Sequence, residues 1–442
     1  MNYDLAREVI GCLDVSGSSR VHAERLSSFN ARDWNRTLRW LDESGLALLL
    51  WRRLEVLGAV GVLPAEMRAA LERNLRDHRR RITEMAREFD SINRAFESAG
   101  VEYVALKGFA LIPEYCPCAS LRTTYDYDYL VYPAELKRAC KALEIAHYRL
   151  EPGSEGEPLV YHHRNSSPHR PVSRDDLYSD DFPRTVEMHA QFWNPDELKI
   201  GLDFQGDFLA RRELRHLTAK QLGVGESELC SGLRFWALRQ EDELLFQLLH
   251  AFRHILQDWC RLVSLLDIAW FVDRRSSDTS FWESFLERLR PCPALREIAG
   301  LILSLSAQLF RASLPAMVAA DTARTARAAT SLWIDRYGFE SALSNFARNK
   351  FSLLLHREFV ADASVWQGIE HRRLFPLHRP NRAADAGTRD LRARVAAGWK
   401  QSVYVLRRVH HHALGYARYR LERLRWERMF EGDDPAAAPP RA

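Results

Sequence analysis

Apolar side chains in the first hundred residues recur at helical spacing. They include Leu71, Leu75, Ile82, Met85, Phe89, Ile92 and Phe96. Gly58, Gly61 and Pro64 interrupt the pattern once, and Gly100 ends it. The spacing predicts a helical region over residues 1–100. We expect its basic cluster, Arg79-Arg80-Arg81, to be a solvated helix face, with a phosphate contact as the alternative.

A different pattern begins after Gly100. Residues 101–106 form an apolar run that suits a buried strand, and Lys107-Gly108 follows as a turn. A second apolar run begins with Asp126 and Asp128, which are separated by one residue. Successive strand side chains point to opposite faces, so both carboxylates are expected on one face. Two carboxylates placed this way suit a divalent metal such as Mg²⁺, which prefers oxygen ligands.

Short runs with strand character continue the region, and helical spacing then returns. A helix is predicted over 134–146 and strands over 147–150, 159–163 and 185–192. The fold class is therefore α+β, with a small mixed-sheet core between two helical regions. The predicted divisions are an N-terminal helical region, an α/β core, a connection, a C-terminal helical domain and a disordered tail, over 1–100, 101–195, 196–240, 241–431 and 432–442.

Composition narrows the classes of partner only slightly. The 442 residues carry 63 Lys and Arg against 59 Asp and Glu, a formal charge of +4, which demands no nucleic-acid partner. The seven cysteines are scattered and odd in number, as expected of reduced thiols. No secretory signal and no apolar run long enough for a membrane span are evident. We therefore expect a cytoplasmic protein.

The order of these motifs resembles the uncharacterised bacterial nucleotidyltransferases of the DNA polymerase beta superfamily. The residues that carry the resemblance are Leu106-Lys107-Gly108, Arg122, Asp126-Tyr127-Asp128-Tyr129-Leu130-Val131 and Val186-Glu187-Met188-His189. The resemblance is closest over residues 101–193. It implies transfer of a nucleoside monophosphate from an NTP such as ATP, with release of pyrophosphate. The acceptor stays open among a small molecule, a protein and RNA.

The resemblance also implies roles for particular residues. The expected metal ligands and catalytic acids are Asp126, Asp128 and Glu187, which would hold two Mg²⁺ ions. The expected triphosphate-binding residues are Lys107, Gly108 and Arg122. Glycine has no side chain, so the backbone of the turn can approach the phosphates closely, and the two cationic side chains would neutralise the phosphate charge. His189 is expected beside the ligands or facing the acceptor. The remaining candidates, His250, His254 and Asp267, would support the helical region or line the acceptor side.

Each assignment has an ordinary structural alternative. The two aspartates would merely solvate a strand edge, Glu187 and His189 would form the polar side of an edge strand, and Lys107 would be a surface cation. His250 and His254, four residues apart, more often make core hydrogen bonds than bind metal. Bulky Tyr127 and Tyr129 beside the acids would also fit a catalytically degenerate nucleotide-binding scaffold.

The alternative scaffold would act through a basic C-terminal helix. Residues 390–430 combine arginines and aromatic residues with apolar positions at helical spacing. Such a helix could contact RNA, an anionic membrane surface or an acidic partner. The simpler interpretation, which we favour from the pattern, is a packed helix whose arginine stems cover apolar surface.

Overall fold

A computed structural model describes most of the chain as two compact units. The described residues are 2–17, 19–153, 158–164, 177–204, 206–225, 232–343, 349–375 and 391–430. The first unit comprises residues 1–252 and 261–326, and the second comprises 253–260 and 327–442. The predicted tail over 432–442 lies outside the described residues. Each unit is described by itself below.

The first unit begins with helices where the spacing predicts them. They are α1 (Tyr3–Cys12), α2 (Ser19–Arg25), α3 (Ala31–Ser44), α4 (Ala47–Leu57) and α5 (Ala65–Ser98), with short 3₁₀ turns η1 (Leu26–Ser28) and η2 (Val60–Val62). Asn30 and Asp33 form a capping box at the start of α3. Gly45 ends this helix in the left-handed conformation, with φ of +78°.

A seven-stranded mixed sheet follows, which confirms the predicted fold class. Its strands are β1 (Tyr103–Ala105), β2 (Asp126–Val131), β3 (Tyr148–Leu150), β4 (Leu159–His163), β5 (Thr185–His189), β6 (Glu213–Leu217) and β7 (Leu233–Ala237). Their order is β3-β4-β5-β2-β1-β7-β6. β2 pairs in parallel with β5 and antiparallel with β1. The segment 196–240, expected only as a connection, supplies β6 and β7.

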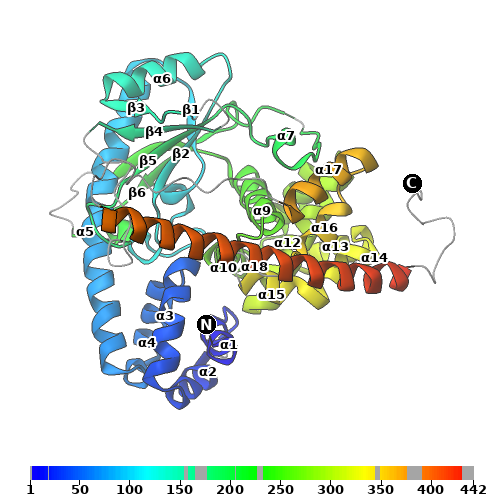
Figure 1. Cartoon of the computed structure of the whole chain (residues 1–442). Coiled ribbons are helices and arrows are strands. Elements are labelled where there is room, and N and C mark those ends of the chain that lie inside the picture. Colours follow the sequence, from blue (N-terminus) through cyan, green and yellow to red (C-terminus); the bar gives the residue numbers. More distant parts are fainter. Residues whose placement is uncertain are drawn as a thin grey trace. The chain divides into compact units, whose positions relative to one another are not determined.

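Side chains of β2 alternate between a helix-covered face and the face that carries the acids. The Tyr127 and Tyr129 rings lie 6.0 and 5.8 Å from the ring of Phe89 on α5. Tyr127 donates to Glu88 at 2.8 Å, and Tyr129 donates to Asn93 at 2.8 Å. Figure 1 shows α5 running alongside the strands. The two tyrosines therefore point toward α5, and Tyr127 contributes to the wall of the cavity that Asp126 and Asp128 also line.

The expectation of a solvated Arg79-Arg80-Arg81 face is wrong for Arg81. This side chain is fully buried and donates to the carbonyls of Leu177 at 3.0 Å and Thr124 at 2.8 Å. Arg81 lies four residues before Met85 on α5, so it shares the face that packs on the sheet. Burial lowers the pKa of its guanidinium to about 10. Arg81 thus anchors the segment that leads into β2.

The remaining elements are mostly helical. The first unit adds η3 (Gly108–Leu111), η4 (Ala119–Leu121), α6 (Leu136–Ile145), α7 (Pro195–Leu198), α8 (Ala219–Leu222), α10 (Leu262–Arg274), α11 (Thr279–Leu289), α12 (Pro293–Phe310) and α13 (Ala316–Thr325). Helix α9 (Gln240–Leu256) begins in the first unit, and its last residues belong to the second. The second unit contains α14 (Ala328–Trp333), the π-helix η6 (Ile334–Gly338), α15 (Phe339–Leu343), α16 (Ser352–Arg357), α17 (Ala363–Leu374) and α18 (Leu391–Phe430).

The chain turns at Asp258, between α9 and α10. Asp258 adopts a left-handed conformation, with φ of +58°, and its buried carboxylate pairs with Lys350 at 2.9 Å and Arg373 at 3.0 Å. None of the helices in the described segments has both the length and the apolar character needed to cross a membrane.

Candidate active site

Parallel pairing of β2 with β5 brings two carboxylates and an imidazole together. The register places Asp128 opposite Glu187 and Leu130 opposite His189. One ligand atom each from Asp128, Glu187 and His189 lie within 4.8 Å of one another, and no other such group occurs among the described residues. His189 Nε2 lies 3.2 Å from Asp128 Oδ1 and 3.9 Å from Glu187 Oε2.

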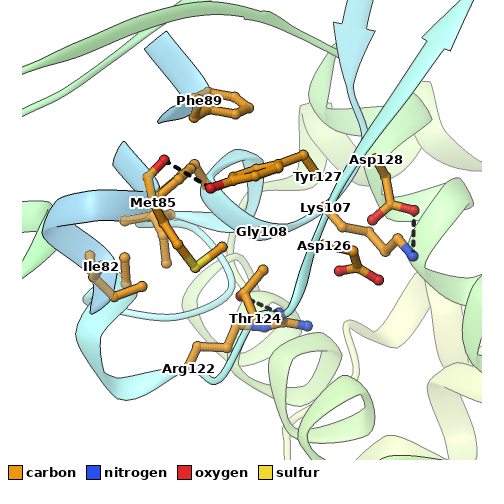
Figure 2. A pocket seen from close by; sticks show the side chains of 13 residues that line it. Ile82, Met85, Phe89, Lys107, Gly108, Arg122, Thr124, Asp126, Tyr127 and Asp128 are labelled. Carbon is orange, nitrogen blue, oxygen red and sulfur yellow. Dashed lines mark hydrogen bonds and ion pairs between the residues drawn. The ribbon is translucent and has the colours of Figure 1, made fainter. Parts of the chain in front are cut away.

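Asp126 completes the acidic side of the site from the start of β2. Its carboxyl group lies outside the group of three ligand atoms but lines the same cavity as Asp128. Figure 2 shows Asp126, Asp128 and Lys107 on one side of the strand and Tyr127 on the other. The alternation predicted for Asp126 and Asp128 is therefore present.

Lys107 contacts Asp128, the most deeply buried carboxylate of the acidic cluster. Its Nζ lies 2.7 Å from Asp128 Oδ1, and the two side chains are 14% and 0% exposed. Gly108 follows with φ of +63°, a conformation that side chains other than hydrogen disfavour. A Cβ at this position would lie 3.3 Å from Thr124 Cγ2. The turn therefore needs glycine, and Lys107 is an interior cation rather than a surface one.

The charges in this cluster shift one another's proton affinities. Burial would raise the pKa of Asp128, but the Lys107 ammonium and the His189 hydrogen bond hold it below its usual range. Burial and the nearby Asp128 charge raise the pKa of Glu187 to about 8. Burial and Asp128 also raise the pKa of Asp126, against the opposing charge of Lys107. Three acids crowded around one ammonium thus leave unbalanced negative charge, which favours a further cation.

Arg122 reaches the cavity from the segment before β2 and is held by Asp267. Its Nε donates to Asp267 Oδ2 at 2.7 Å, and both side chains are buried. Burial would lower the pKa of Arg122, but the Asp267 carboxylate outweighs it and raises the pKa above its usual value. The backbone carbonyl of Arg122 also lies 3.2 Å from His78 Nε2. Asp267 thus fixes the guanidinium beside the acids.

A cavity joins the polar groups to an apolar wall. It encloses about 370 Å³ of empty space, which includes open solvent at its mouth. Its polar lining comprises Lys107, Gly108, Arg122, Thr124, Asp126 and Asp128. Its apolar lining comprises Ile82, Met85, Phe89, Phe109, Ile112, Ala119 and Tyr127.

Two residues that sequence reasoning missed hold the segment between Arg122 and β2. Arg261, just before α10, donates to Thr123 Oγ1 at 2.7 Å, and its guanidinium lies 5.3 Å from the centre of the Tyr125 ring. Arg81 lies 5.0 Å from the centre of the same ring. The positive charge of Arg261 also opposes the rise in the pKa of Asp126 that burial causes. No local motif marks these residues, because folding brings them together from distant parts of the chain.

Two predicted candidates do not join this group of ligands. His250 stacks on Phe246 with ring centres 6.1 Å apart, and His254 meets Trp259 edge-on at 4.7 Å. Within the described residues, neither histidine belongs to a cluster of potential metal ligands. Each histidine thus packs against an aromatic ring, and the roles expected for this pair stay predictions.

Comparison with known families decides the class of the protein. Residues 30–311 match the model of a family described as uncharacterised nucleotidyltransferase, which covers more than half of the 442 residues. The chain belongs to this family. The matched part of this nucleotidyltransferase contains the whole sheet and the Arg122–Asp267 pair. No curated protein and no solved structure matches the chain.

Nucleotidyltransferases usually use divalent metals, and the residues of the acidic cluster fit one. Asp128 Oδ2 is buried and has no hydrogen-bond partner within the described part of the chain. A buried carboxylate oxygen without a donor is costly unless a cation or a proton satisfies it. Glu187 and His189 offer further ligand atoms within 4.8 Å. Oxygen and imidazole ligands together suit a divalent cation of the first transition row as well as Mg²⁺.

Proposed function

We propose that this nucleotidyltransferase transfers a nucleoside monophosphate from an NTP to an acceptor hydroxyl, with Mg²⁺ and with release of pyrophosphate. The observation that carries the proposal is the meeting of Asp128 and Glu187 on paired strands, with the ammonium of Lys107 beside them. Acids for a metal and a cation for phosphate thus lie together beside the central strands of the sheet. This is the charge arrangement that phosphoryl and nucleotidyl transfer require.

The metal would be held by Asp126, Asp128 and Glu187, with His189 as a neighbouring donor. Bound divalent cations would neutralise the triphosphate and the charge that develops on its oxygens. His189 orients Asp128 by the contact between Nε2 and Oδ1 at 3.2 Å. The strand pairing fixes the carboxylates relative to each other, because both positions lie in regular ladder register.

The triphosphate would lie between the Lys107-Gly108 turn and Arg122. Glycine leaves the backbone of the turn open to close approach by phosphate oxygens. Asp267 accepts a hydrogen bond from Nε of Arg122, so the guanidinium group is oriented before the substrate binds. The sugar and base would extend beyond these phosphate-binding groups. Lys107 would exchange its contact with Asp128 for one with phosphate.

The acceptor would approach from the side of Glu187. The Glu187 side chain is 26% exposed, against 11% for His189 and 0% for Asp128. The acceptor oxygen would attack the α-phosphorus while the bond to the oxygen bridging the α- and β-phosphates breaks. Pyrophosphate leaves with that oxygen, and the hydroxyl proton passes to solvent. The acceptor class stays open among a small molecule, a protein and RNA.

Turnover tests the proposal. The full chain would be incubated with each NTP labelled at the α-phosphate and with Mg²⁺, and both pyrophosphate and transferred label would be measured. Asp128→Asn should abolish both products, whereas Asp196→Asn, which alters an exposed carboxylate paired with Lys199, should leave them unchanged. Equal turnover by Asp128→Asn and wild type would refute the assigned site. Nucleotide binding with no product from any acceptor class would favour the degenerate scaffold.

A further inference from the structure

Helix α18 carries an exposed apolar stripe that the proposed reaction does not use. Five of its large apolar side chains are mostly exposed: Trp399 (72%), Leu406 (68%), Val409 (60%), Leu421 (62%) and Leu424 (51%). At 3.6 residues per turn these positions fall within an arc of about 120°. Eight of the fifteen large hydrophobic residues that are exposed in the described chain lie on this one helix, which Figure 1 draws in orange and red.

The opposite side of α18 packs within its own unit. Tyr419 and Trp426 are buried, and Tyr419 donates to Glu370 at 2.6 Å. The Trp426 ring lies 6.0 Å from that of Tyr337. Each buried residue lies two positions from a member of the stripe, Leu421 or Leu424, and such positions are on opposite sides of a helix. The stripe is therefore a second apolar face, in addition to the one that anchors the helix.

Positive charge accompanies the stripe. Residues 391–430 contain ten Lys and Arg and only two acids, Glu422 and Glu427. Both acids are neutralised within the helix, Glu422 by Arg425 at 2.9 Å and Glu427 by Arg423 at 2.7 Å.

Several of the arginines keep their charge available. In the described residues, no ion pair involves four of them: Arg407, Arg418, Arg420 and Arg428. Helical geometry places Arg407 and Arg418 along one flank of the stripe, whereas Arg420 and Arg428 lie between its apolar positions. The exposed face thus combines apolar side chains with arginines that lie beside and between them.

From this pattern we infer that α18 docks on the surface of an anionic lipid bilayer. Leucine, valine and tryptophan enter the acyl boundary, while flanking arginines meet anionic headgroups. A second copy fits less well, because two such helices, each with eight more cations than acids, would repel. Single-stranded nucleic acid is bound by cations and stacked aromatic rings, and most of the stripe is aliphatic.

Flotation of the full chain with vesicles tests the inference, independently of nucleotidyl transfer. Binding is expected to vesicles that contain phosphatidylglycerol and to be much weaker with phosphatidylcholine alone. Leu406→Gln/Val409→Gln should lower the bound-to-free ratio by about tenfold or more. Arg407→Gln/Arg418→Gln should lower it roughly thirtyfold at low salt. Circular dichroism would check that each variant is folded.

A matched control uses apolar residues of similar exposure elsewhere. Val56 is 61% exposed and Ile145 is 70% exposed, and Val56→Gln/Ile145→Gln should leave vesicle binding unchanged. Absence of binding by folded wild-type protein, or an equal loss in this control, would overturn the inference. A dimer that Leu406→Gln/Val409→Gln dissociates would overturn it in favour of self-association. RNA binding lost in the same variant, without vesicle binding, would overturn it in favour of a nucleic-acid surface.

Discussion

Removal of the Lys107 charge should destabilise the protein by an amount that a divalent cation restores. Lys107→Met keeps most of the apolar stem but leaves Asp128, whose side chain is 0% exposed, without the ammonium at 2.7 Å. Breaking a buried ion pair costs roughly 3–5 kcal/mol. Asp128 still has His189 at 3.2 Å and is free to take up a proton, which reduces the cost. We expect a loss of about 3 kcal/mol at neutral pH.

The direction of the pH dependence follows from Asp128. Its pKa in the folded protein lies below the ordinary value of 3.8, so its stabilising contribution is present above that value. The contribution disappears as the pH falls through the folded-state pKa. The stability difference between wild type and Lys107→Met should therefore be large at neutral pH and small in strong acid.

Urea unfolding measures this difference with and without Mg²⁺. In the presence of chelator the Lys107→Met midpoint should fall, and excess Mg²⁺ should narrow the gap, because the cation supplies the missing charge. Lys199→Met is the matched control. It breaks an ion pair at 2.8 Å whose side chains are 40% and 85% exposed, and should cost less than about 1 kcal/mol. Equal losses in the two variants would refute the reasoning.

Three further changes test neighbouring parts of the site. Asp267→Asn removes the charged partner of Arg122 and should raise the KM for NTP about tenfold. The affinity for Mg²⁺, measured by calorimetry, should stay unchanged, and weaker Mg²⁺ binding would contradict this prediction. The pKa of Glu187 is raised to about 8 from 4.5. The contribution of its protonated carboxyl group to the free energy of unfolding is therefore fully present below pH 4.5 and is lost as the pH rises through 8. Glu187→Gln should therefore match wild type in acid and exceed it by about 2 kcal/mol at alkaline pH, and thermal unfolding that shows no pH-dependent gap would argue against this. Gly108→Ala, at φ of +63° and with Thr124 at 3.3 Å, should cost about 1–2 kcal/mol in urea unfolding, and a neutral result would show that the turn tolerates a side chain.

Local pattern was enough to predict the acidic strand. Alternation alone placed Asp126 and Asp128 on one face of β2, and the apolar runs located β4 at its observed bounds. Strand pairing then placed Glu187 opposite Asp128, where the resemblance expected the third acid. These features depend on residues that are close in sequence or on regular ladder geometry, and such features leave a periodic signal.

Features that depend on tertiary contacts left no such signal. Arg122 and Asp267 are separated by 145 positions, and only the folded chain shows that they pair. Burial of Arg81 depends on which face of α5 meets the sheet, and local charge suggested the opposite. Strand β6 is short and interrupted by charged residues, so its apolar alternation is weak, and β7 is only five residues long. The roles assigned to the site residues remain predictions.

Calorimetry of Mg²⁺-dependent NTP binding tests the central claim most directly. Wild-type protein and the Asp126→Asn/Asp128→Asn variant would be titrated with each of the ribonucleoside triphosphates, with Mg²⁺ or with chelator. The account predicts a binding heat for at least one NTP that requires both Mg²⁺ and the two carboxylates. Equal NTP binding by the folded variant, or by wild type in chelator, would contradict the claim that these acids form the metal–triphosphate site.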